Sequence, residues 1–212
     1  MKINEIFYSI QGEVDVGMPA IFIRLQGCNM EPKCSFCDSS YSWNEGEEMD
    51  NDKIYEIIKV WLDKCQYIVF TGGEPMVQID DVCKFASYLN NKRDDLTLGY
   101  GLETNGTIYS DNIFIFNKIS VSPKKQNYNF EALNEFNMKE SRFKFVYDND
   151  LWFEKIIKEL DLGPWQVWIM PEGKTKSEQE DRMEEVIEYC KEKGYNFTPR
   201  LHTLIWDNRR AK

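Results

Sequence analysis

The sequence predicts an α/β fold built around a mostly parallel sheet, and three observations lead to this expectation. Short apolar segments alternate with amphipathic helical segments, which is typical of parallel strands joined by crossover helices. A length of 212 residues, of which 42% are hydrophobic, suits one domain with a sizeable core. No repeat, low-complexity segment or clear linker interrupts the chain. We therefore expect one domain over residues 1–212.

The expected strands are short, apolar and rich in Ile, Val and Phe. The first spans residues 20–26 and leads directly into a cysteine-rich loop. Six more are expected at 67–70, 98–103, 118–122, 143–147, 167–170 and 195–198. The carboxyl ends of parallel strands meet on one face, where α/β folds carry their chemistry. We expect that face to hold Cys28, Thr71, Glu103, Ser122 and Met170.

The expected helices each carry one apolar face. The first begins at Asn51 or Asp52, which are good N-caps, after a polar and irregular stretch at 41–50. Its apolar face consists of Ile54, Ile57, Ile58, Trp61 and Leu62. Two further apolar faces are Ile79, Val82, Cys83 and Ala86, and Phe153, Ile156, Ile157 and Leu160. The last long helix is expected to begin at a capping box formed by Ser177 and Glu180.

Three of the six cysteines are expected to lie outside any metal site. Cys83 and Cys190 fall in register with apolar helix faces, so we expect them in the core. Cys65 lies at a helix end and has no evident partner.

Charge and hydropathy limit the function classes. The net charge is −10 with scattered Lys and Arg, whereas direct nucleic-acid binding usually needs a basic face. We therefore expect a small-molecule substrate and no direct contact with nucleic acid. No apolar run approaches a membrane span and no signal-peptide pattern opens the chain, so a cytoplasmic location without membrane contact is expected. Six cysteines in that setting favour metal or redox chemistry over disulfides.

The loop at 28–39 holds the pattern C-x5-C-x2-C, formed by Cys28, Cys34 and Cys37. Gly27 and Pro32 disfavour a regular helix there. A structural zinc site normally uses four Cys or His ligands in two pairs, and only one close pair is present. A [4Fe–4S] cluster takes one thiolate per iron, so three local thiolates would leave one iron open to a small molecule. Buried core cysteines are the alternative, but these three lack helix or strand periodicity.

These cysteines resemble the cluster motif of radical S-adenosylmethionine (SAM) enzymes, usually C-x3-C-x2-C with an aromatic residue before the last Cys, as Phe36 is here. This chain has two extra residues between Cys28 and Cys34. The resemblance narrows to the 7-carboxy-7-deazaguanine synthase family through an ordered set of segments that spans nearly the whole chain. The set comprises residues 5–13, 22–29, 37–39, 71–75, 103–106, 122–124 and 201–206.

The resemblance implies a shortened, open (β/α) partial barrel and a defined reaction. A reduced [4Fe–4S] cluster would cleave SAM, and the resulting radical would abstract hydrogen from 6-carboxy-5,6,7,8-tetrahydropterin. Ring contraction with loss of ammonia would give 7-carboxy-7-deazaguanine for queuosine or related 7-deazapurines. Mg²⁺, an external flavodoxin- or ferredoxin-like electron donor and a homodimer are also implied. Because the cluster and SAM generate the radical, no catalytic side chain is assigned.

The resemblance also implies roles for individual residues of this chain. Cys28, Cys34 and Cys37 would hold the cluster, and the Ser39 hydroxyl would bind Mg²⁺. SAM would contact Phe36, Cys37, Asp38, Gly73, Glu74, Asn105, Ser122, Pro123 and Lys124. Substrate would contact Ile10, Gln11, Gly12, Arg24, Thr71, Glu103, His202 and the C-terminal segment 200–212.

Residue chemistry supports some of these roles and leaves others open. The Glu103 carboxylate suits the paired N–H donors of an amino-pyrimidinone edge. Arg24 is expected to point inward and needs an anion, which is either a substrate carboxylate or a structural acid. His202, the only histidine, could instead be structural, and Ser39 could instead cap a turn. The segments at 72–75 and 105–106 could be simple turns.

Two other functions remain open at this point. One is a glycyl-radical activase of the same superfamily, whose substrate is a protein. The segments at 9–13 and 201–206 argue against it. The other is a non-catalytic iron or zinc module.

Overall fold

The computed structural model describes residues 1–207, 209 and 210, and its centre is one nine-stranded sheet. The strand order is β3-β1-β2-β4-β5-β6-β7-β8-β9. The strands are β1 (Lys2–Ile10), β2 (Pro19–Leu25), β3 (Glu47–Glu48), β4 (Tyr67–Gly72), β5 (Gly99–Thr104), β6 (Lys118–Val121), β7 (Arg142–Tyr147), β8 (Val167–Pro171) and β9 (Asn196–Phe197). Strands β2 and β4 to β9 run parallel, while β1 pairs antiparallel with both β2 and β3. The sheet does not close, which confirms the expected open, mostly parallel α/β architecture.

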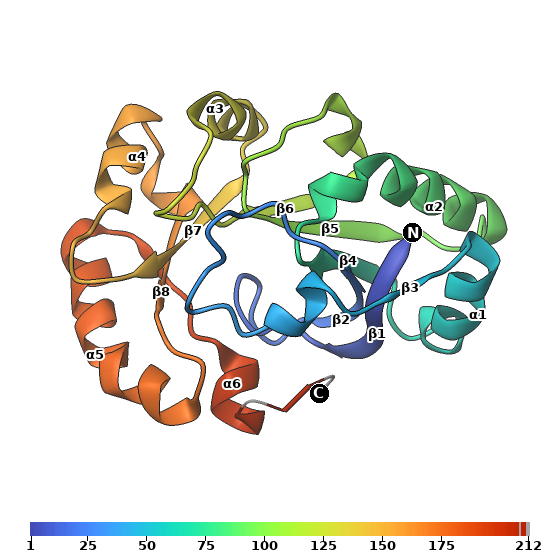
Figure 1. Cartoon of the computed structure of the whole chain (residues 1–212), viewed down its shortest axis with the longest axis horizontal. Coiled ribbons are helices and arrows are strands. Elements are labelled where there is room, and N and C mark those ends of the chain that lie inside the picture. Colours follow the sequence, from blue (N-terminus) through green and yellow to red (C-terminus); the bar gives the residue numbers. More distant parts are fainter. Residues whose placement is uncertain (208, 211–212) are drawn as a thin grey trace.

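Most helices lie along the outside of the curved sheet, whereas the cysteine-rich loop and the short C-terminal helix lie at its concave side (Figure 1). The α-helices are α1 (Asn51–Leu62), α2 (Ile79–Lys92), α3 (Phe130–Met138), α4 (Phe153–Glu159), α5 (Lys176–Lys193) and α6 (Leu201–Trp206). Short 3-10 turns are η1 (Ser40–Trp43), η2 (Pro75–Gln78), η3 (Asp111–Ile115) and η4 (Pro164–Gln166).

Successive side chains of each strand point to opposite faces of the sheet, so one set packs in the apolar core and the other faces the concave side. In β2, Ile21 and Ile23 are fully buried against the helices in the main apolar cluster. Phe22 and Arg24 point the other way and line a cavity on the concave face. The same alternation in β7 buries Phe143 and Phe145 and turns Lys144 into the cavity. Inward polar residues on otherwise apolar strands therefore mark the concave face.

Two predicted N-caps are wrong, although the first long helix, α1, begins at Asn51 as expected. The long helix α5 is capped by Thr175, whose side chain accepts from the Glu178 amide in a reciprocal capping box. Ser177 and Glu180 lie inside the helix, so the true box begins two residues earlier than predicted. Helix α1 is capped by Asp50, which accepts from Lys53, rather than by Asn51 or Asp52.

Several elements were not predicted from the sequence. Strand β1 lies antiparallel between β2 and the edge strand β3, and the stretch expected to be irregular at 41–50 contains η1 and β3. Helix α3 follows the N-cap Asn129, and α6 begins after Arg200 without a side-chain cap. Within the part of the chain that is described, no helix has the length and apolar character needed to cross a membrane.

Candidate functional site

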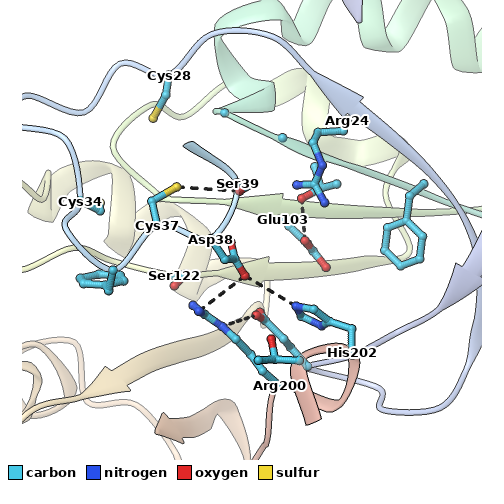
Figure 2. A pocket seen from close by; sticks show the side chains of 18 of the residues that line it. Arg24, Cys28, Cys34, Cys37, Asp38, Ser39, Glu103, Ser122, Arg200 and His202 are labelled. Carbon is cyan, nitrogen blue, oxygen red and sulfur yellow. Dashed lines mark hydrogen bonds and ion pairs between the residues drawn. The ribbon is translucent and has the colours of Figure 1, made fainter. Parts of the chain in front are cut away.

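The concave face of the sheet holds a cavity of about 230 Å³. It is lined by all three cysteines of the C-x5-C-x2-C motif together with residues from β2, β4, β5, β6 and β7. In the view of Figure 2, the cysteines lie on the left and Arg24, Glu103 and His202 lie on the right. The predicted convergence of strand ends is confirmed for Cys28, which follows β2, and for Thr71, Glu103 and Ser122. Met170 also lies near the carboxyl end of a parallel strand, β8, but it is buried and does not line the cavity.

The cysteine-rich loop is held in place by hydrogen bonds at both ends. The Gly27 amide donates to the Ser42 carbonyl at 2.9 Å, and the Lys33 ammonium donates to the Cys28 carbonyl at 2.7 Å. The Cys37 amide donates to the Cys34 carbonyl at 3.3 Å, which closes a turn between the paired cysteines. These bonds fix the path of the loop around the three thiols.

A close backbone approach joins this loop to the turn after β4. The Glu74 amide donates to the Gly27 carbonyl at 2.7 Å, and the Gly73 amide donates to the Leu25 carbonyl at 3.1 Å. A Cβ atom at Gly73 would lie 1.7 Å from the Gly27 carbonyl oxygen, so only glycine fits there. The Gly72-Gly73 pair therefore locks the cysteine loop onto the sheet, and Gly73 also lines the cavity.

The three thiols fit a metal cluster by their chemistry. Each is a free, partly exposed cysteine on one cavity. Burial raises the pKa values of the Cys28 and Cys34 thiols, so iron binding there must displace their protons. Among the described residues that line the cavity, no fourth cysteine is present. Cys65 and Cys190 are buried in the apolar core and Cys83 packs against it, as predicted for Cys83 and Cys190.

Lys124 and Ser122 lie beside the thiols at the end of β6. The Lys124 ammonium donates to the Ser122 hydroxyl at 2.6 Å and lies 5.7 Å from the centre of the Phe36 ring. Burial lowers the pKa of Lys124, although the neighbouring Cys34 opposes that shift. All three residues line the cavity, and their predicted contact with SAM stays a prediction.

Two predicted substrate residues contact each other on neighbouring strands. The Thr71 hydroxyl donates to the Glu103 carboxylate at 2.7 Å, and this leaves the other carboxylate oxygen for a ligand. Arg24 lies on β2 at the same cavity, and its guanidinium donates to Glu5 at 2.8 Å. Tyr41 also donates to Glu5, at 2.9 Å. The structural acid that the sequence left open as a partner for Arg24 is therefore Glu5.

A network of charged side chains lines the opposite wall of the cavity. The Arg200 guanidinium lies 3.2 Å from Glu13 and 3.5 Å from Asp38, and Lys144 also pairs with Glu13. His202 lies 3.6 Å from Asp38 (Figure 2). Burial alone would raise the pKa of Asp38, but Arg200, His202 and Arg24 outweigh it and hold the pKa far below its usual range. Asp38 is therefore a fixed negative charge next to Cys37.

Three members of this network have the spacing of a cation site. Glu13, Asp38 and His202 each place one donor atom within 4.8 Å of the others. Arg200 already contacts both carboxylates. The Arg200 guanidinium therefore supplies the positive charge between these carboxylates, and we interpret the three residues as part of an ion-pair network.

The N-terminal and C-terminal segments meet at Gly12 and His202. The Leu201 amide donates to the Gly12 carbonyl at 2.6 Å. A Cβ atom at Gly12 would lie 2.1 Å from His202 Nδ1, so glycine is required for this contact. Ile10, Gln11 and Gly12 all line the cavity with His202, which brings both ends of the chain to one site. Residues 208, 211 and 212 of the predicted segment 200–212 lie outside the described residues.

Other predicted contacts fall in different places. Asp38, Ser39 and Asn105 line the cavity, and the Asn105 side chain donates to Asn29 of the cysteine loop at 2.9 Å. Glu74 and Pro123 do not line it. The Glu74 carboxylate is buried, where it accepts from the Asn105 and Met76 amides and the Thr104 hydroxyl at 2.6, 3.0 and 2.7 Å.

Sequence reasoning missed several residues of the site. Lys144 and Arg200 line the cavity but were assigned no individual role. Lys144 carried a signal, because it is a lone charge between Phe143 and Phe145 in an apolar strand. Glu13 lay within a quoted motif but was not singled out. Their common site depends on contacts between segments more than 100 residues apart, which periodicity does not reveal.

Comparisons with known proteins agree with this geometry. The model of the radical SAM superfamily matches residues 22–162. A curated 7-carboxy-7-deazaguanine synthase from Halobacterium salinarum is 32% identical, with 98% of this chain and 91% of the relative covered. The protein of the same name from Pyrobaculum aerophilum is also 32% identical, with 100% and 97% covered.

Solved structures share the fold. A crystal structure of QueE from Escherichia coli aligns with a TM-score of 0.73 and 23% identity over 95% of this chain and 94% of that one. A structure titled native anSMEcpe with bound AdoMet aligns with a TM-score of 0.55 and 17% identity over 81% of this chain and 61% of that one. The full-length curated relatives and the superfamily match, together with three thiols on one cavity, lead to one conclusion: the chain belongs to the 7-carboxy-7-deazaguanine synthase family of the radical SAM superfamily.

Proposed function

We propose that this protein converts 6-carboxy-5,6,7,8-tetrahydropterin to 7-carboxy-7-deazaguanine with release of ammonia, in the synthesis of queuosine or related 7-deazapurines. The observation that carries the proposal is the composition of one cavity. It combines the three motif cysteines with Glu103 and Arg24, which suit the two ends of a carboxypterin. The full-length likeness to curated synthases supports the same reaction.

In this proposal Cys28, Cys34 and Cys37 hold a [4Fe–4S] cluster. With SAM bound, the cluster supplies the radical chemistry that starts the ring contraction. The protein's own part is to bind, orient and exclude water. Phe36, Cys37, Asp38, Gly73, Asn105, Ser122 and Lys124 would form the SAM side of the cavity, with Glu74 and Pro123 supporting it from outside the lining.

Substrate recognition would use both walls of the cavity. Glu103 accepts the paired N–H donors of the pterin edge, and Thr71 orients it by the hydrogen bond described above. Arg24 offers its guanidinium to the substrate carboxylate in exchange for part of its contact with Glu5. Ile10, Gln11, Gly12 and His202 would close the substrate side of the cavity.

Further parts of the proposal concern the setting of the reaction. Ser39 would bind Mg²⁺ through its hydroxyl, together with the substrate carboxylate and water, because a single neutral oxygen is a weak ligand. We also propose a single domain over residues 1–212, a homodimer, a cytoplasmic location and an external flavodoxin- or ferredoxin-like electron donor.

Anaerobic reconstitution tests the proposed reaction. The protein is loaded with iron and sulfide and then given SAM, a reductant, Mg²⁺ and the carboxytetrahydropterin. Ammonia and the deazapurine acid should appear together without any partner protein. The variant Glu103→Gln keeps the side-chain shape but loses a charged acceptor, so we expect kcat/KM to fall about 10- to 100-fold.

The same experiment separates the alternatives. A glycyl-radical activase would need a protein substrate and would leave the free pterin unchanged. A non-catalytic module would give colourless protein with zinc, or iron without turnover. Either result would overturn the proposed reaction.

A further inference from the structure

Gln126 makes a direct contact with one of the motif cysteines. Its side-chain amide nitrogen lies 2.9 Å from the Cys34 sulfur and donates a hydrogen bond to it. Gln126 follows β6 and is half-buried, but it does not line the cavity. A ligand in the cavity therefore does not meet this side chain directly, and Gln126 reaches the site only through Cys34.

The turn that carries Gln126 is anchored on both sides. The Asn127 amide donates to the Lys124 carbonyl at 3.1 Å, which closes the turn. On the exposed side Lys125 pairs with Asp148 at 3.2 Å and with Asp150. The backbone around Gln126 is thus fixed, and its amide is held against Cys34 before any cluster binds.

This contact has a consequence for an iron–sulfur cluster. A hydrogen bond to a ligating sulfur stabilises the more electron-rich, reduced state and so raises the reduction potential. We propose that Gln126 is a positioning residue that holds the Cys34 thiolate and raises the reduction potential of the [4Fe–4S] cluster through this hydrogen bond. The proposal rests on the cluster that the family implies, and it does not depend on the identity of the substrate.

An EPR-monitored redox titration of the reconstituted protein, without SAM or pterin, tests the proposal. Gln126→Leu removes the donor, and Gln126→Glu replaces it with a negatively charged acceptor of the same shape. Losing one hydrogen bond to a charged group should lower the equilibrium constant for reduction about tenfold, which is about 59 mV for one electron. Gln126→Glu should lower the potential by more. Asn127→Ala, on an exposed neighbour in the same turn, is the matched control and should leave it unchanged.

A second readout does not depend on the potential. The reduced protein prepared in H₂O and in D₂O should show an exchangeable-proton coupling to the cluster in its ENDOR spectrum, and this coupling should be lost in Gln126→Leu. An unchanged midpoint in both Gln126 variants would overturn the proposal. Loss of iron with no shift in the midpoint potential of the clusters that remain would also overturn it. If Gln126→Leu assembles no cluster, Gln126→Glu and the wild-type coupling decide the question.

Discussion

At the scale of single residues, the cysteines fall into two groups that the structure separates by surroundings. Cys34 lies on the cavity beside Lys124 and Gln126, whereas Cys83 is part of α2 and its thiol lies 3.4 Å from the Asn112 carbonyl oxygen. We expect Cys34→Ala to abolish cluster assembly and Cys83→Ala to leave it intact, because only the first removes a metal ligand. Iron per chain and visible absorption after reconstitution measure this. Equal iron loss in the two variants would contradict the assignment.

Glu74 shows how far a motif can specify a single side chain. The sequence places it in a turn that contacts a ligand, but the structure buries its carboxylate against one donor of the same turn, Met76, and two long-range donors, Thr104 and Asn105. Burial raises the pKa of Glu74, and the three hydrogen bonds oppose that shift. Whether the backbone or the side chain of a turn meets the cavity depends on such long-range partners, which a local motif does not contain.

A prediction follows for Glu74→Gln. The amide group would point at least one N–H toward the donors of Asn105, Met76 or Thr104, leaving a buried donor unpaired. We expect the free energy of unfolding to fall by about 1–3 kcal/mol, as measured by denaturant unfolding of the metal-free protein. Glu56→Gln is the control, because Glu56 is in an exposed pair with Lys59 and should change stability by less than about 1 kcal/mol. A Glu74 variant as stable as this control would contradict the buried network.

At the scale of elements, the loop between β1 and β2 completes the cavity wall. Its Asp15 carboxylate reaches Lys118 of β6 at 3.1 Å and Arg142 of β7 at 2.6 Å. Glu13 of the same loop contacts Lys144 and Arg200. The loop therefore links the antiparallel strand β1 to β6 and β7, which are not its neighbours in the sheet.

The variant Asp15→Asn tests the contribution of these two ion pairs to stability. Asn tolerates the positive φ of 62° at this position, so the variant removes mainly the charge. Burial would raise the pKa of Asp15, but Arg142 and Lys118 outweigh it and lower the pKa. Because the folded state then binds the carboxyl proton less tightly than the unfolded state, the stabilisation is present above about pH 4 and is lost as the pH falls further.

We expect Asp15→Asn to lose about 1 kcal/mol at pH 7 after allowing for solvent screening, and the difference from wild type should shrink at acid pH. Denaturant unfolding across this pH range provides the measurement. Asp161→Asn is a matched control, since Asp161 is exposed and also has a positive φ, of 51°. A pH-independent difference would show that the ion pairs are not its source.

Elements with a strong local signal were predictable, and those defined by partners were not. Strands β4 to β8 and helices α1, α2 and α5 carry clear apolar periodicity, and the sequence places them within a few residues. Helix α6 has six residues and no side-chain cap, and it exists through contacts with α5 and Gly12. The sequence did not identify the N-cap Thr175, because Ser177 and Glu180 have the same spacing as Thr175 and Glu178 and lie two residues later.

At the scale of the whole molecule, charge is distributed unevenly. Among the described residues, seven Lys or Arg side chains and four carboxylates line the cavity, although the chain carries a net charge of −10. The surface outside the cavity is therefore strongly acidic. Net charge is readable from the sequence, but the gathering of basic residues on one concave face is a product of the fold.

This distribution predicts that the protein acts on a free small anion and does not hold nucleic acid. Neutralising phosphates requires a continuous basic face, whereas only seven of the 26 Lys and Arg residues gather at the cavity, and in the rest of the sequence Asp and Glu outnumber Lys and Arg. In fluorescence anisotropy with labelled tRNA or duplex DNA, we expect no binding up to about 100 μM protein at about 0.1 M salt. Arg209 and Arg210, which line the cavity near the chain end, are the one basic doublet in the tail. If binding were seen, the double variant Arg209→Gln and Arg210→Gln would test the tail as its source. Binding that survives this change and weakens with salt would contradict the acidic-surface argument.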